Sequence, residues 1–170
     1  MKYKLTLTFS LLSLLTFVTA CSPPEPAKAP VATQQNRPYH KIFKVKGTFS
    51  EIRDFLIFSL QDHGLKVNNV SHIGDMLERT GKDLGRTKKV YEHAEGIEFC
   101  SSTLSRNMME ADRDNIVFCP YIIYIYVKPS DPGMVYLSYR IPNQQGSPAV
   151  NKTLQDVQDL IEDIIKGAMS

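Results

Sequence analysis

Two stretches in the C-terminal half alternate aliphatic side chains with polar or aromatic ones. They are YIIYIYV (residues 121–127) and MVYLSYRI (residues 134–141), and the hexapeptide KPSDPG lies between them. Alternation at every second residue is typical of a β-strand, and a short segment rich in turn residues favours a hairpin. The pattern therefore predicts an antiparallel hairpin with one aliphatic face.

Two other stretches repeat apolar residues at the spacing of an α-helix. The first follows Thr48 and Glu51, which have the spacing of a capping box, and it ends near Gly64. The second begins at Asn151 and runs towards the C-terminus. Each helix is expected to bury one apolar face. The apolar positions are Ile52, Phe55, Leu56 and Leu60 in the first helix and Leu154, Val157, Leu160, Ile161 and Ile164 in the second.

Shorter patterns fill the chain between these elements. Strands are predicted at residues 41–45, at 65–70 and within 89–100, with helices over 71–84 and from residue 102 or 103 to 111. The resulting order is β-α-β-α-β-α-β-β-α. A single α+β domain over residues 39–170, with a mainly antiparallel sheet and helices on one face, is the simplest architecture.

The first 38 residues follow a different pattern. Lys2 and Lys4 precede an apolar run from Leu5 to Val18, which is the layout of a secretory signal peptide over residues 1–20. Residues 18–21, VTAC, resemble a bacterial lipobox, which implies cleavage before Cys21 and acylation of that residue. An ordinary signal peptide with a chance cysteine is the alternative. Residues 21–38 are rich in proline and alanine and predict a tether.

Removal of the signal changes the charge and implies a location. The 150 remaining residues are enough for one domain with a core. Without Lys2 and Lys4, the basic residues fall from 20 to 18 and equal the 18 acidic residues, so no net charge favours nucleic acid. Ser22 after the cysteine resembles the signal for delivery to the outer membrane of a Gram-negative cell, facing the periplasm.

The globular part resembles domain-of-unknown-function family 302. The resemblance rests on FSEIRDFLIFSLQDHGLKV (residues 49–67), on FCSSTLSRNMMEADRDNIVFCPYIIYIYV (residues 99–127) and on a final hairpin that closes in Ile141-Pro142. It covers residues 42–165 and implies the fold; the family has no settled activity. The chain departs from the family pattern at both cysteines. Ser101-Ser102 follow Cys100 where family members often have an asparagine-proline pair, and a proline follows Cys119 where family members often have one before the cysteine.

Cys100 and Cys119 are the two thiols that an acylated Cys21 leaves in the mature chain. A structural disulfide is the favoured interpretation in an oxidising periplasm. Two buried free cysteines come second, and redox or metal chemistry comes third, because the four histidines are scattered and the cysteines lack Cys-x-x-Cys spacing. A disulfide requires the end of the third strand to lie beside the start of the fourth, as in antiparallel neighbours.

Two surfaces are candidates for binding. On the hairpin, one face is expected to carry tyrosines beside cations, which suits stacking and contacts with anions; a solvated sheet face is the alternative. Its residues are Tyr124, Tyr126, Lys128, Tyr136 and Arg140.

A basic run could contact lipid phosphates, lipopolysaccharide or an acidic partner, or be a solvated loop. Its residues are Arg79, Lys82, Arg86, Lys88 and Lys89.

No motif indicates catalysis, a metal or a cofactor, so the sequence favours a non-enzymatic role. Three functions are carried forward. The first is a tethered domain that docks a protein partner as an accessory or structural component of an envelope assembly. The second is a periplasmic module that binds a small molecule or lipid, and the third is a thiol-redox protein that uses Cys100 and Cys119. Homo-oligomerisation is left open.

Overall fold

The structure, a computed structural model, describes residues 39–170. The expected signal peptide (1–20) and tether (21–38), including Cys21, lie outside the described residues. The described elements are β1 (His40–Lys46), α1 (Phe49–Asp62), β2 (Val67–Ser71), α2 (Ile73–Asp83), β3 (His93–Phe99), α3 (Ser102–Ala111), the 3-10 helix η1 (Arg113–Phe118), β4 (Tyr121–Val127), β5 (Met134–Arg140) and α4 (Pro148–Gly167). The predicted α+β class and the order of strands and helices are confirmed.

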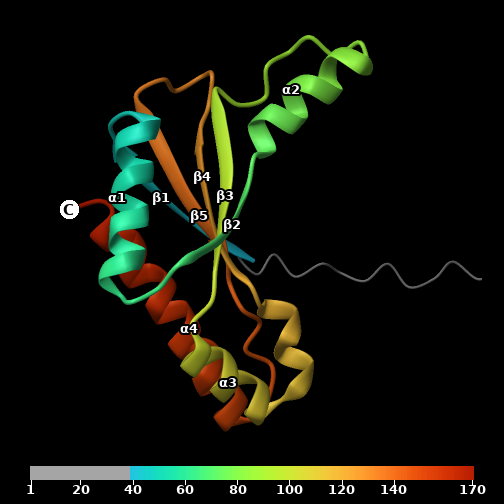
Figure 1. The fold of residues 1–170 in the computed structure, drawn as a ribbon. Helices are drawn as coiled ribbons and strands as arrows, with labels where there is room; N and C mark the ends of the chain where they lie inside the picture. The colour runs from blue at the N-terminus through green and yellow to red at the C-terminus, as the bar shows by residue number, and fades with distance from the viewer. Residues whose placement is uncertain (1–38) are drawn as a thin grey trace, which may run out of the picture. The chain divides into compact units, whose positions relative to one another are not determined.

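The strands form one five-stranded sheet in the order β1-β5-β4-β3-β2 (Figure 1). Every pair of neighbours is antiparallel. The predicted hairpin is the β4–β5 pair, in which Ile125 lies opposite Leu137 and Tyr126 opposite Tyr136. Strand β1 occupies one edge of the sheet and β2, which contains a register shift between Val67 and Asn69, occupies the other.

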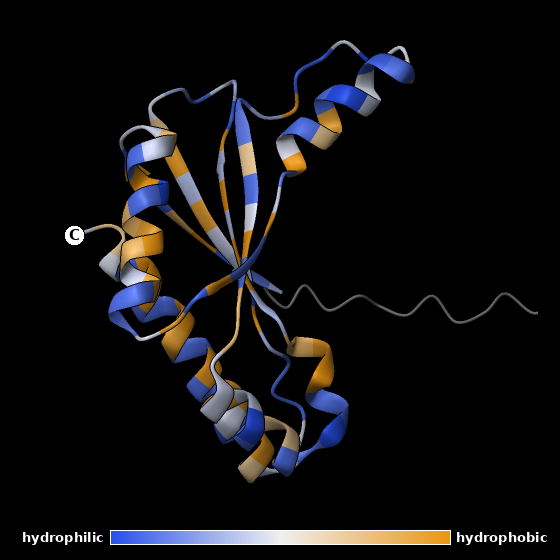
Figure 2. Cartoon of the chain, in the orientation of Figure 1, coloured by the Kyte–Doolittle hydropathy of each residue, from blue (hydrophilic) through white to orange (hydrophobic). Residues whose placement is uncertain are grey.

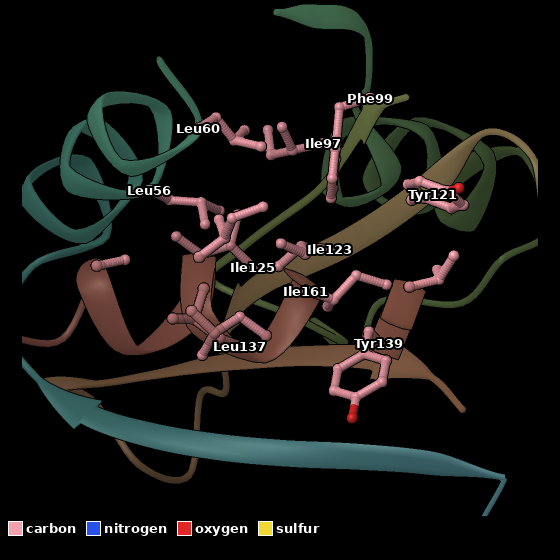
Figure 3. Packing of buried hydrophobic residues seen from close by; sticks show 14 of the residues in the cluster. Leu56, Leu60, Ile97, Phe99, Tyr121, Ile123, Ile125, Leu137, Tyr139 and Ile161 are labelled. Atoms are coloured by element: carbon pink, nitrogen blue, oxygen red, sulfur yellow. The ribbon is translucent and has the colours of Figure 1, made fainter. Parts of the chain in front are cut away.

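Helices α1 and α4 lie on the same side of the sheet, and the core fills the space between (Figures 1 and 3). Side chains from α1, β3, β4, β5 and α4 meet there because each element turns its apolar positions inward. The fully buried members include Leu56, Leu60, Ile97, Phe99, Ile123, Ile125, Leu137, Leu154 and Ile164. Helix α3 packs against α4 beyond the end of the sheet.

Helix boundaries follow the capping residues. The Thr48 hydroxyl accepts a hydrogen bond from the backbone N–H of Glu51 at the start of α1, as the capping box predicts. The final helix begins at Pro148, three residues before the predicted Asn151. Ser147 caps it by accepting from the N–H of Val150, and proline suits the first turn because its missing N–H needs no partner there.

The 3-10 helix η1 was not predicted. Its six residues are too few for a helical repeat to be visible in the sequence. The Asp112 carboxylate caps it by accepting from the N–H of Asp114, and the buried Asn115 side chain donates to the Met108 carbonyl. These two contacts join η1 to the end of α3.

Helix α2 lies outside the helical layer. It contacts β3 on the side of the sheet opposite α1 and α4 (Figure 1), and none of its residues is buried. Within residues 39–170, no helix combines the length and apolar character needed to cross a bilayer.

One polar cluster ties the edge strand β1 to the helical layer. The Glu162 carboxylate on α4 accepts hydrogen bonds from Lys41 Nζ (2.8 Å) on β1 and from the Tyr139 hydroxyl (2.6 Å) on β5. The phenol oxygen of Tyr139 points out of the apolar cluster (Figure 3), and Gln158 is a third donor, at 3.2 Å. Burial would raise the pKa of Glu162, but the hydrogen bonds from Lys41, Tyr139 and Gln158 outweigh it and lower that pKa.

The substitution Glu162→Gln is therefore expected to lower the free energy of unfolding by about 1–3 kcal/mol at pH 7, because charge-assisted hydrogen bonds are lost. A carboxyl with a lowered pKa stabilises the fold above its ordinary pKa of 4.5, and this contribution is lost as the pH falls through the lower folded value. Urea denaturation at neutral and at strongly acidic pH measures both effects.

Asp163→Asn is the matched control, because Asp163 is an exposed acid on the same helix with a surface partner, Lys166. It is expected to change stability by under about 0.5 kcal/mol. Equal losses for the two substitutions, or a loss from Glu162→Gln that persists unchanged in acid, would contradict the assigned role of Glu162.

Candidate functional site

The sheet face opposite α1 and α4 carries all five residues of the predicted binding face. Antiparallel register and alternation place them there, since Tyr126 lies opposite Tyr136 and Tyr124 opposite Ser138. No helix covers β1 and β5 on this side (Figure 1). We call this surface the tyrosine face. It consists of Tyr124, Tyr126, Lys128, Tyr136 and Arg140, to which the structure adds Lys44, Tyr91 and Asp131.

Tyr136 is the centre of the face, and its neighbours cover it. Its ring stacks on Tyr126 with 5.2 Å between ring centroids and 11° between planes. Lys128 Nζ lies 4.1 Å from the Tyr136 ring centroid and Lys44 Nζ lies 5.3 Å from it, both within cation–π range. Tyr136 is consequently only 3% exposed, so its ring supports the face and is not open for a ligand to stack on.

The Tyr136 hydroxyl donates to the Asp131 carboxylate in the β4–β5 turn. This hydrogen bond raises the pKa of Tyr136, and burial raises it further. Burial also raises the pKa of Tyr126, whose ring meets the edge of Tyr91 at 5.5 Å and 68°. Both phenols are therefore neutral donors at physiological pH.

Tyr124 and Arg140 form the accessible end of the face. Arg140 Nη2 donates to the Tyr124 hydroxyl at 3.2 Å, and the guanidinium carbon lies 6.0 Å from the Tyr124 ring centroid. Arg140 is exposed and Tyr124 is half-buried. The guanidinium therefore retains N–H donors that can reach an incoming carboxylate or phosphate.

The face is positively charged, and its cations are not engaged in ion pairs within the described part of the chain. Among residues 39–170, no carboxylate forms an ion pair with Lys44, Lys128 or Arg140. The acid nearest the centre, Asp131, is held by Tyr136, and Glu98 accepts hydrogen bonds from Ser71 at 2.8 Å and Asn69 at 3.2 Å. An acidic partner would therefore complement this surface.

The hollows that border Tyr124 are small. A groove of about 180 Å³ runs between Tyr91, Ile73 of α2 and the side chains of Tyr124 and Tyr126. An apolar notch of about 70 Å³ lies between η1 and Arg140. Both are below the roughly 300 Å³ at which small-molecule sites begin. Larger hollows of about 360 and 480 Å³ lie beside α2 and reach the face at Tyr91, and one of about 610 Å³ lies beside residues 141–145.

The cysteines meet at the far end of the β3–β4 pair. The pairing of Phe99 with Tyr121 brings Cys100 and Cys119 together, as the predicted antiparallel neighbours require. Their sulfur atoms lie 3.1 Å apart as two half-buried thiols, and the peptide bond between Cys119 and Pro120 is cis. A disulfide between them stays a prediction. Within the described residues, no group of three His, Cys, Asp or Glu side chains is arranged to hold a metal ion.

Burial raises the pKa of Cys100 to about 11, and the hydrogen bond with Cys119 contributes to the rise. A reactive thiol needs the opposite shift, because the thiolate is the nucleophile. The environment of Cys100 therefore disfavours this residue as the nucleophile of the redox interpretation.

The predicted basic run lies on α2 and the segment after it, and it meets the tyrosine face at Tyr91. Arg79 and Lys82 are on α2, and Arg86, Lys88 and Lys89 are in the segment that leads to β3. All five are exposed, and in Figure 1 the far end of α2 points away from the sheet.

Sequence reasoning missed three members of the tyrosine face. The sequence places Lys44 in a strand, but a five-residue pattern does not determine which strand β1 pairs with. The sequence shows Asp131 only as a residue of the predicted turn, and no pattern marks Tyr91. Alternation along KIFKV was the available signal for Lys44, since it places Lys44 on the face opposite Phe43 and Val45.

Comparisons with known proteins agree on the fold. The family model described as domain of unknown function DUF302 matches residues 42–170. A crystal structure of an uncharacterized conserved DUF302 protein from Bacillus stearothermophilus has a TM-score of 0.65 and 14% sequence identity, over 78% of this chain and 99% of that chain. No curated protein matches this chain.

The raised pKa of Cys100 makes a testable prediction for the reduced protein. A thiol with a pKa of about 11 has roughly 100-fold less thiolate at pH 8 than one with the ordinary value of 9.0. Alkylation by iodoacetamide, followed by peptide mass spectrometry, is expected to modify Cys100 about that much more slowly in the native than in the urea-unfolded protein. Equal rates in the two states would contradict this environment for Cys100.

Proposed function

This chain belongs to the family described as domain of unknown function DUF302, and since that description carries no activity we propose its function from the geometry. We propose that the chain is a non-enzymatic accessory lipoprotein, anchored by acylated Cys21 to the outer membrane of a Gram-negative cell. In the periplasm its tyrosine face docks a protein partner that presents acidic side chains beside flat apolar groups.

The observation that carries this proposal is the uncovered sheet face with three unpaired cations around a tyrosine stack. Lys44, Lys128 and Arg140 have no acidic partner among the described residues. The two lysines lie beside the stacked rings of Tyr126 and Tyr136, and Arg140 lies beside the Tyr124 ring. Tyrosine and arginine are enriched where proteins bind each other, because they combine apolar area with directed donors.

The shape of the face favours a protein over a small ligand. Its groove and notch hold about 180 and 70 Å³, so a small molecule would stay largely exposed. A protein surface can instead cover Tyr124, Tyr126 and Arg140 together. The raised pKa of Cys100 weighs against this thiol as the nucleophile of the thiol-redox alternative.

A photo-crosslinking amino acid at Tyr124 is expected to trap a specific partner in intact cells. The charge reversals Lys128→Glu and Arg140→Glu together are expected to reduce that adduct at least tenfold, because attraction to the partner's carboxylates becomes repulsion. Immunoblotting of the adduct, with thermal unfolding of the variant as a check on folding, is the measurement.

The matched control is the pair Lys152→Glu and Lys166→Glu on the exposed side of α4, which changes the same number of charges. It should leave the adduct within about twofold of wild type, since surface ion pairs on another face do not meet the partner. An adduct that survives the reversals on the tyrosine face, or falls equally in the control, argues against docking there.

The anchor has a separate test. Intact mass spectrometry of the protein purified from membranes is expected to give residues 21–170 plus a diacylglycerol and a further acyl chain. Three chains suffice for stable attachment where one is marginal. An unmodified Cys21, or a mature chain that begins elsewhere, would overturn the anchor without affecting the docking proposal.

A further inference from the structure

Helix α2 has an apolar side that the domain does not cover. A helix in a globular domain is normally held by burial of its apolar stripe, yet no residue of α2 is buried. Met76 is 43% exposed, Leu84 just beyond the helix is 68% exposed, and Val90 in the following segment is 54% exposed. Figure 2 shows hydrophobic positions between hydrophilic ones along this helix.

The helix is held to the domain at its first turn. A side chain at Gly74 would approach the Ala94 backbone nitrogen to 3.0 Å, so only glycine allows this close contact with β3. His72 Nδ1 lies 3.4 Å from a Glu95 carboxylate oxygen beside it. Every residue from 82 to 90 is exposed, and the far end of α2 and its return segment are therefore presented to whatever surrounds the domain.

The exposed end is strongly cationic. Between residues 79 and 89 the chain has five basic residues and one acid, Asp83, which is a net charge of +4. Lys82 pairs with Glu78 at 4.0 Å and Lys89 with Glu92 at 2.7 Å. Among the described residues, Arg79, Arg86 and Lys88 have no acidic partner.

Apolar and cationic groups share one hollow there. A cavity of about 480 Å³ between α2 and its return segment is lined by the apolar Leu77, Leu84 and Val90, by the cations Arg86 and Lys88, and by one acid, Glu78. We propose that α2 and residues 84–90 form a contact surface for an anionic phospholipid bilayer, with the cations on lipid phosphates and the apolar side chains at the boundary of the acyl chains.

The mixture of groups favours a bilayer over an acidic protein. A protein interface has a contiguous apolar centre with charges at its rim. Here Leu84 and Val90 are separated by Arg86, Lys88 and Lys89 within seven residues. Interleaved cations and apolar groups suit the headgroup layer, where phosphates and acyl chains are met within a few ångströms of each other.

The position of α2 is compatible with the proposed anchor, on which this part of the inference rests. Strand β1 starts at His40, which pairs with Arg140. The segment after α2 enters β3 at His93, and the pairings of β3 with β4, β4 with β5 and β5 with β1 place that residue at the opposite end of the sheet, where β1 ends. The seven residues of β1 span about 23 Å. Residues 22–38 could span up to about 60 Å if fully extended, so attachment at Cys21 allows either end of the domain to reach the bilayer.

The test uses a chain that starts at Ser22 and carries no lipid, so its outcome is independent of the anchor. The match to the solved DUF302 protein covers 99% of that chain and 78% of this one. The other protein therefore consists almost entirely of this domain, which indicates that the domain folds without the residues that precede it here. Co-sedimentation is measured with vesicles of pure phosphatidylcholine and with vesicles of equal parts phosphatidylcholine and phosphatidylglycerol.

Binding is expected to be at least tenfold stronger to the anionic vesicles and to weaken as salt is raised. The triple variant Arg79→Gln, Arg86→Gln, Lys88→Gln is expected to lose about 100-fold, since each cation near an anionic surface contributes about fivefold. Leu84→Ser with Val90→Ser keeps the charge and is expected to lose about tenfold through reduced insertion.

The matched control removes three cations from the tyrosine face by Lys44→Gln, Lys128→Gln and Arg140→Gln, and should stay within about threefold of wild type. Equal losses in the two triple variants, no effect of Leu84→Ser with Val90→Ser, or no preference for anionic vesicles would each overturn the lipid surface. Binding of polyglutamate but not of anionic vesicles, through the same three cations, would assign the surface to an acidic protein.

Discussion

The packing of α1 and α4 against a single face of the sheet is the interaction on which the rest of this structure depends. The two helices supply Leu56, Leu60, Leu154 and Ile164 to a core whose other half comes from alternate residues of β3, β4 and β5. Burial of that aliphatic face is the main source of stability, at roughly 1.5–3 kcal/mol for each large side chain. Because the helices cover one face only, the other face is free to carry polar, aromatic and charged groups.

The face opposite α1 and α4 is organised, although among the described elements only α2 packs on it, at β3. Lys44 and Lys128 lie over the Tyr136 ring, and the Asp131 carboxylate accepts a hydrogen bond from its hydroxyl. The lysine side chains and the β4–β5 turn therefore shield this ring from solvent, as α1 and α4 shield the residues on the other face. These contacts shield the central ring and leave Tyr124 and Arg140 accessible. The same arrangement that protects the sheet therefore sets the charge and the reach of the candidate docking surface.

Most of the fold was predictable because its signals are local. Strands β4 and β5 alternate cleanly, α1 has its cap at Thr48, and α4 repeats its apolar residues over several turns, so each element is evident within its own segment. Helix η1 and the start of α4 were not predicted, because the first is too short for a period and the second depends on a Ser147 cap outside the apolar repeat. The tyrosine face was predicted as a set of residues but not as an arrangement, since Lys44 and Tyr91 join it from distant segments.

By itself the sequence determined the α+β class, the order of elements, the two faces of the hairpin and the resemblance to a family, because periodicity and turn residues act over a few neighbours. Tertiary structure alone decided that Tyr136 is covered while Tyr124 is accessible, that Cys100 has a thiol with a raised pKa, and that α2 stands apart from the core with its cations exposed. These properties depend on burial and on contacts between residues far apart in the chain, which no local pattern encodes.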